Sequence, residues 1–217
     1  MTAAPDLAVP ASRGAFYYVI GAFTAPHSRV RELMAELRLK SLAWQIVLFC
    51  AAISAASGIA SNYFDHKYRG GVSYILPPDY PVADTLIWGA IEFLIFIAGF
   101  PVARFLWSYL FGYRDEERGV WAASAMAMCP LIILDPLLEI ISFFTGSDEE
   151  TSLYLLVFVA YAFVSAAITA LYYAAALAIS YLRAAALAFA SMLIYLLAAI
   201  VLTTVIILLP SFLFPPV

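Results

Sequence analysis

Residues 184–209 read AAALAFASMLIYLLAAIVLTTVIILL, 26 consecutive positions without a charged side chain. A helix rises about 1.5 Å per residue, and the hydrocarbon core of a bilayer is about 30 Å thick, so about 20 apolar residues are enough to cross it. The stretch exceeds that length. It therefore predicts a transmembrane helix, and with it an integral membrane protein.

Four further apolar stretches precede this one, and each reaches the length of a membrane span. They are residues 41–60, 86–111, 120–144 and 152–180. Charged residues make up 12% of the chain and hydrophobic residues 65%, whereas a soluble domain carries about a quarter charged residues. The sequence thus predicts an all-α membrane bundle of five transmembrane helices over residues 41–209, with an external C-terminal tail at residues 210–217.

The segment before the first span divides into two parts. Residues 1–25 form a tail with a short apolar segment that is too short to span. Residues 26–40 start with a proline, which suits the first turn of a helix, and then carry apolar residues at helical spacing. These are Val30, Leu33, Met34 and Leu37. The pattern predicts an amphipathic helix in the cytoplasmic interface of the membrane; the alternative is that its apolar face packs on other protein.

The basic residues indicate the orientation of the chain. Of the 11 Lys and Arg residues, two (Lys67 and Arg69) flank one set of span ends and nine flank the other. Cytoplasmic loops carry the excess of basic residues. We therefore expect a multi-pass protein of the cell membrane, in the bacterial case the inner membrane, with a cytoplasmic N-terminus and an external C-terminus. The nine are Arg13, Arg29, Arg31, Arg38, Lys40, Arg104, Arg114, Arg118 and Arg183.

Three carboxylates lie inside the predicted spans: Glu92 in the second, and Asp135 and Glu139 in the third. An ionisable side chain in lipid is costly to keep, so it indicates a site or a specific partner. The expected topology places all three at a similar depth in the outer leaflet, as a candidate acidic cluster. Two interpretations stay open. One is structural pairing, for instance with Lys67 and Arg69; the other is a site for a proton, a cation or a substrate.

The third span also contains Pro130 and Pro136. Proline has no backbone N–H and bends or breaks a helix, so we predict a bend there, where Asp135 in its protonated form would satisfy freed backbone groups. The loop after the second span contains a charged run that is either a solvated cytoplasmic loop or a docking site for a partner. Its residues are Arg114, Asp115, Glu116, Glu117 and Arg118.

Hydroxyl side chains form stripes at helical spacing along the last two spans. The stripes consist of Tyr161, Ser165, Thr169 and Tyr172 in the fourth span, and Ser191 and Tyr195 in the fifth. Small and hydroxyl residues serve close helix packing in membranes. We favour packing over a substrate path as the interpretation.

Motifs for catalysis are missing from the sequence. It has no His-Glu-x-x-His, no Gly-x-Ser-x-Gly and no glycine-rich phosphate loop. The two cysteines, Cys50 and Cys129, fall in apolar spans and are interpreted as packing residues. We therefore expect no catalytic residue, no cofactor, no metal site and no nucleic-acid partner.

Several features together resemble the Yip (Ypt-interacting-protein) domain family in its bacterial form. They are a helix headed by Phe23-Thr-Ala-Pro26, a short loop opening with Gly112-Tyr113-Arg114, a third span led by Trp121 through Met128-Cys129-Pro130, and a closing pair of Ala- and Tyr-rich spans. The resemblance covers about residues 16–208. The Asp-Leu-Tyr-Gly-Pro signature of eukaryotic members is absent, so their trafficking roles are not carried to residues here.

The resemblance implies a five-span fold and a membrane address. With it, we expect a non-enzymatic membrane-organising or scaffold protein that binds lipid, other membrane proteins or a second copy of itself. The alternative, from a different class, is a small transporter or permease subunit that uses the intramembrane carboxylates for protons or cations.

Overall fold

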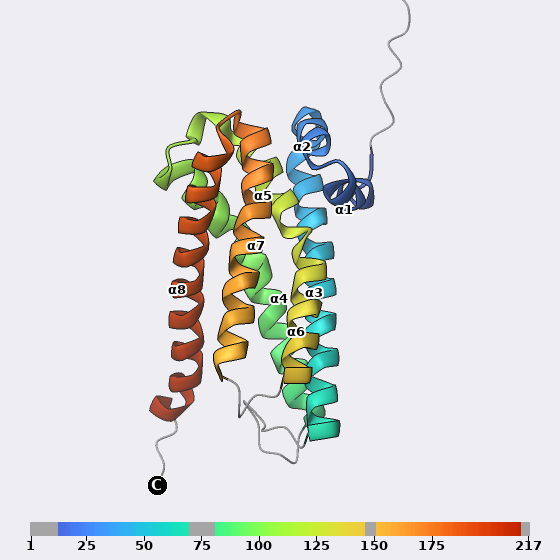
Figure 1. Ribbon diagram of the computed structural model, residues 1–217, viewed down its shortest axis with the longest axis vertical. Helices are drawn as coiled ribbons and strands as arrows, with labels where there is room; N and C mark the ends of the chain where they lie inside the picture. Colours follow the sequence, from blue (N-terminus) through green and yellow to red (C-terminus); the bar gives the residue numbers. More distant parts are fainter. Residues whose placement is uncertain (1–12, 70–80, 146–150, 214–217) are drawn as a thin grey trace, which may run out of the picture.

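The computed structural model describes residues 13–69, 81–145 and 151–213. Within these ranges the chain is helical apart from short connections, and no strand occurs (Figure 1). The all-α prediction is confirmed for this part of the chain.

Four segments are long and apolar enough to cross a membrane: Leu39–Phe64, Val82–Leu110, Arg114–Leu138 and Val159–Leu177. They fall at the first four predicted spans, and the protein is therefore a multi-pass membrane protein. The helices that carry them are α3 (Leu39–Arg69), α4 (Pro81–Phe105) with η1 (Leu106–Leu110), α5 (Glu117–Met128) with α6 (Leu131–Thr145), and α7 (Thr151–Leu177). Helix α3 continues nine residues beyond the predicted end of the first span at residue 60.

The last helix, α8 (Tyr181–Leu213), lies beside α7 along the bundle (Figure 1). A short turn connects the two, and Ala178 in that turn takes a positive φ of 51°. Helix α8 extends to Leu213, so the predicted tail at residues 210–217 starts too early: residues 210–213 are helical, and residues 214–217 lie outside the described ranges.

Two short helices, α1 (Ala15–Thr24) and α2 (Pro26–Ala35), pack at one end of the bundle (Figure 1). The predicted helix over residues 26–40 is therefore wrong at its C-terminal end. Glu36 is extended, with ψ 132°, and the Arg118 guanidinium donates to the carbonyls of Met34 (2.7 Å) and Glu36 (2.6 Å). These bonds satisfy carbonyl groups that a helix end leaves open.

The apolar face of α2 is covered by protein. Val30 and Leu33 are fully buried, and α2 packs against α5 and α7. Leu37, which follows the helix, is 93% exposed. The structure thus corrects the expectation that this face lies against lipid, and the protein-packed alternative describes it.

Helix α1, in contrast, turns an apolar face outward. Phe16, Ile20 and Phe23 are spaced by about one helical turn and are 62%, 48% and 43% exposed. The Phe16 ring meets the Phe49 ring of α3 edge-on, with centroids 6.1 Å apart. Phe49 is itself exposed on a membrane-spanning helix, so the outward face of α1 continues the apolar surface of α3.

An ionic network holds α1 to α2. Arg13, Arg29 and the Tyr17 hydroxyl all donate to the Glu32 carboxylate, with 2.7 Å from Arg29 and 3.0 Å from Tyr17. Burial acts to raise the pKa of Glu32, but the hydrogen bonds from Arg29 and Tyr17 outweigh it and hold this pKa below its ordinary value. Glu32 therefore remains ionised at neutral pH and keeps the two helices joined.

Replacing Arg118 by alanine is expected to loosen α2 from the bundle. The change removes two charge-assisted bonds to carbonyls, and because the site is open to solvent we expect a loss of about 1 kcal/mol. Lysine at 118 should restore little, because a single ammonium does not reproduce the planar fork of arginine. Thermal unfolding in detergent and limited proteolysis after Ala35 measure the effect. Arg114→Ala, an exposed change nearby, is the control; equal stability of both variants would argue against the capping role.

Candidate intramembrane site

Asp135 is the point where three helices meet. It lies on α6, and its Oδ2 accepts a hydrogen bond from the Ser54 hydroxyl of α3 at 2.9 Å. Its Oδ1 accepts one from the Tyr161 hydroxyl of α7. Each carboxyl oxygen thus has a hydroxyl donor from another helix, which satisfies a polar group that lipid alone would leave without a partner.

The local sequence explains how Asp135 reaches these partners. Helix α5 ends at Met128 and α6 begins at Leu131, so the third span is interrupted at Cys129 and Pro130, whereas Pro136 lies within α6. Asp135 bonds side chains of other helices, where the sequence led us to expect bonds to backbone groups freed by the prolines.

Glu92 on α4 approaches the same helix α3. A Cβ atom at Gly58 would lie 1.8 Å from Glu92 Oε2, so glycine at this position leaves room for the carboxyl group. Gly58 and Ser54 are four residues apart and share a face of α3, about 6 Å along its axis. The structure therefore brings Glu92 and Asp135 to successive turns of one helix.

The other members of the predicted cluster and its proposed partners are placed as follows. The side chains of Glu139 and Arg69 lie outside the described part of the chain. The Lys67 ammonium lies over the rings of Tyr63 and Tyr68, 5.9 and 5.3 Å from their centroids. Lys67 thus contacts tyrosines of its own helix.

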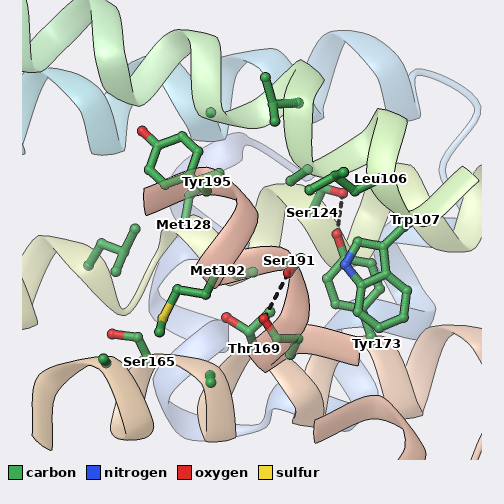
Figure 2. A pocket seen from close by; sticks show the side chains of 18 of the residues that line it. Leu106, Trp107, Ser124, Met128, Ser165, Thr169, Tyr173, Ser191, Met192 and Tyr195 are labelled. Carbon is green, nitrogen blue, oxygen red and sulfur yellow. Dashed lines mark hydrogen bonds between the residues drawn. The ribbon is translucent and has the colours of Figure 1, made fainter. Parts of the chain in front are cut away.

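A cavity of about 300 Å³ opens between α4, α5, α7 and α8 (Figure 2). This is the lower end of the roughly 300–1,000 Å³ that ligand pockets occupy. Small residues from all four helices leave the space open, among them Gly99, Ala127, Ala162 and Ala188. The lining residues fall in the membrane-spanning segments or in the apolar segment Tyr181–Tyr195, so the cavity lies within the depth of the bilayer.

The hydroxyl stripes of the last two spans face this cavity. Five of their six members line it: Tyr161, Ser165, Thr169, Ser191 and Tyr195. The sixth, Tyr172, donates instead to the carbonyl of Ala22 at 3.0 Å and fastens α7 to α1. The stripes were interpreted as packing surfaces from sequence, but in the structure most of their hydroxyls border a cavity.

Tyr161 joins the cavity to Asp135, because its side chain lines the cavity and its hydroxyl donates to the carboxyl group. Nearby, Tyr195 also lines the cavity, and its hydroxyl donates to the carbonyl of Ile95 at 2.9 Å. Asp135 therefore lies one hydroxyl group behind the cavity wall.

A second polar group borders the cavity toward the α1 and α2 end of the bundle. The rings of Trp107 and Tyr173 stack with centroids 3.6 Å apart, and the Tyr173 hydroxyl shares a 2.6 Å hydrogen bond with Ser124. Trp107 is fully buried, and among the described residues its Nε1 has no acceptor. Figure 2 shows this nitrogen on the ring edge turned toward the middle of the cavity.

Two residues of the charged run after the second span bind other parts of the chain. Glu117 pairs with Lys40 at 2.9 Å, and Arg118 binds the end of α2. Arg114, Asp115 and Glu116 are exposed in the 3-10 turn η2 (Arg114–Glu116). Three members of the predicted docking loop are thus open to solvent.

The buried thiols of Cys50 and Cys129 are free. In the described ranges, no three His, Cys, Asp or Glu side chains gather as metal ligands would. The chain was also compared with protein-family models, curated proteins and solved structures. None of them matches it.

Sequence reasoning missed Ser54, Gly58 and Trp107. Ser54 and Gly58 stand one turn apart in a mostly apolar span, and that spacing of small residues is the signal that marks a close helix contact. Trp107 near the end of the second span gives no signal of its own, since tryptophan is common at membrane interfaces.

Proposed function

We propose that this protein is a non-enzymatic, membrane-organising protein that holds a lipid-like amphiphile in the cavity between α4, α5, α7 and α8. The carrying observation is the cavity itself: it lies at bilayer depth, has mostly apolar walls and is bordered by hydroxyl groups. Apolar walls with a few placed polar groups are typical of ligand sites, and the surrounding lipid supplies ligands of matching chemistry.

The proposal includes the five-span topology. Helix α8 has 33 residues, or about 50 Å of helix, which exceeds the roughly 30 Å of hydrocarbon. We place the end that carries α1 and α2 in the cytoplasm. At this end the Lys40–Glu117 ion pair joins α3 to α5, and the Arg118 bonds join α5 to α2. These segments are rich in basic residues, and the positive-inside rule assigns such an end to the cytoplasm.

We propose a Yip-type protein of a bacterial inner membrane, on the sequence features given above. The exposed residues Arg114, Asp115 and Glu116 form the surface through which a protein partner would bind. The outward apolar face of α1, with Phe16 and Ile20 exposed, would then take the interfacial position first expected for residues 26–40.

Filling the cavity tests the proposed function. Ser165→Phe adds a ring to the cavity wall, whereas Val164→Phe adds the same ring at a neighbouring, 44% exposed position of α7. Native mass spectrometry of the purified protein with a monoacyl phospholipid should show binding to the wild type and to Val164→Phe, and at least a tenfold loss in Ser165→Phe. Binding that is equal in all three proteins would contradict a lipid site in this cavity.

A second candidate function rests on Asp135. Its carboxyl group is one hydroxyl removed from the cavity, and a carboxyl group in a membrane can carry a proton or bind a cation. This observation keeps a small transporter or permease subunit as the alternative.

A further inference from the structure

One end of the cavity carries a buried hydrogen-bond donor, the indole N–H of Trp107. Indole is a donor without acceptor capacity, and a buried donor without a partner costs about 1–3 kcal/mol. Trp107 is fully buried, lines the cavity and has no acceptor among the described residues. A ligand that brings an acceptor to Nε1 would satisfy this group.

Three of the hydroxyl groups that line this cavity are already bonded within the protein. Ser124 and Tyr173 are bonded to each other at 2.6 Å, and Ser191 donates to the carbonyl of Ala188 at 2.8 Å. The Trp107 N–H is thus a fully buried donor at this end without an acceptor among the described residues, and the stack of its ring on Tyr173 holds it in place.

The depth of Trp107 suggests the kind of acceptor. It lies three residues from the end of the span Val82–Leu110, about 5 Å in from that end, where the bilayer changes from hydrocarbon to its polar interface. The cavity wall extends from Tyr173 to Tyr161 on α7, roughly 18 Å of helix. A cavity with mostly apolar walls along this length of α7 and an unpaired donor near the interface fits one chain with a carbonyl at its head.

We infer that the ligand of the proposed site is a single-chain amphiphile whose ester carbonyl accepts a hydrogen bond from Trp107 Nε1. Its chain lies along α7 toward Tyr161 and Tyr195. This inference rests on the proposed function and adds to it the group that is recognised and the direction in which the chain lies.

A pair of lipids that differ in one group tests it. The probes are a monoacyl phosphatidylcholine with an ester linkage and its ether-linked counterpart of equal chain length, which lacks the carbonyl. Their affinities for the purified protein are measured by native mass spectrometry and by competition in nanodiscs. One hydrogen bond should make the ester form bind about fivefold more tightly to the wild type.

Trp107→Phe keeps a ring for the stack on Tyr173 and removes the N–H. It should bind both lipids equally, at the affinity of the wild type for the ether form. Trp88→Phe, on helix α4 just before η1 along the chain but away from the cavity lining, should keep the preference for the ester.

The outcomes distinguish the role of Trp107 from the presence of a lipid site in the cavity. Equal binding of ester and ether lipids by the wild type would overturn the role of Trp107 and leave the lipid site intact; this result requires no variant to fold. Failure of the wild type to bind either lipid would overturn the proposed function and this inference together. A preference that persists in Trp107→Phe would assign the carbonyl to another donor.

Discussion

Replacement of Asp135 by leucine is expected to destabilise the protein by roughly 2–4 kcal/mol, because it leaves the hydroxyls of Ser54 and Tyr161 without their shared acceptor. It also removes the side-chain hydrogen bonds that join α6 to α3 and α7. Asp135→Asn should stay close to the wild type, since the amide oxygen and nitrogen can each bond one of the two hydroxyls.

Thermal unfolding of the purified variants in detergent measures this difference. Ile133→Leu, at a 55% exposed position of the same helix, controls for a general effect of substitution in α6. Equal melting temperatures for the leucine and asparagine variants would show that the three-helix contact at Asp135 contributes little.

The asparagine variant also separates the two candidate functions. In proteoliposomes, a transporter that uses Asp135 should show pH- or ion-dependent flux that Asp135→Asn abolishes while its fold stays intact. A lipid-binding protein should bind the monoacyl lipid equally well with aspartate or asparagine at 135. Wild-type protein without flux would argue against the transporter.

Replacement of Gly89 should have the other large effect, on the contact between α3 and α4. A Cβ atom at Gly89 would lie 2.3 Å from Ile59 Cγ1 and 3.4 Å from the Ala55 carbonyl oxygen. Gly89→Ala should cost about 1–3 kcal/mol through overpacking, and Gly89→Leu should cost more, because its longer side chain must push the two helices apart.

A second substitution shows whether the clash with Ile59 is the cause. Ile59→Ala removes the atoms nearest to the new Cβ. The double variant should therefore lose less unfolding free energy than the sum of the losses in the two single variants. Gly14→Ala, where no atom lies within 4 Å of the added Cβ, should not change the melting temperature. Additive effects of Gly89→Ala and Ile59→Ala would contradict a direct contact.

The two short N-terminal helices show how far local patterns reach. The spacing of Val30 and Leu33 predicts a helix with one apolar face, and Pro26–Ala35 is helical, because periodicity is a property of the segment itself. It does not say what covers the apolar face. In the structure α5 and α7 cover it, and the end of α2 is set by Arg118, more than 80 residues later in the sequence.

The candidate site likewise has some features that the sequence indicates and others that only the structure shows. Asp135 and the hydroxyl stripes stand out in the sequence, because polar groups are conspicuous in apolar spans. Two other features depend on which helices are neighbours in the bundle. Asp135 bonds Ser54, 81 residues earlier, and Tyr161 links this carboxyl group to a cavity. Trp107 matters because no acceptor for its Nε1 lies among the described residues, and no single segment of sequence reveals this.

The sequence by itself determined the class of the protein, the approximate positions of four spans and the residues that are costly to keep in lipid. These follow from length and hydropathy, since about 20 apolar residues must cross the hydrocarbon core. Tertiary structure alone decided the contacts of α2, the approach of Glu92 and Asp135 to α3, and the cavity. Lipid tails are as apolar as leucine, so hydrophobicity does not select which helix faces meet. That choice comes from the fit of small residues such as Gly58 and Gly89 and from hydrogen bonds between helices, which exist once the whole bundle has formed.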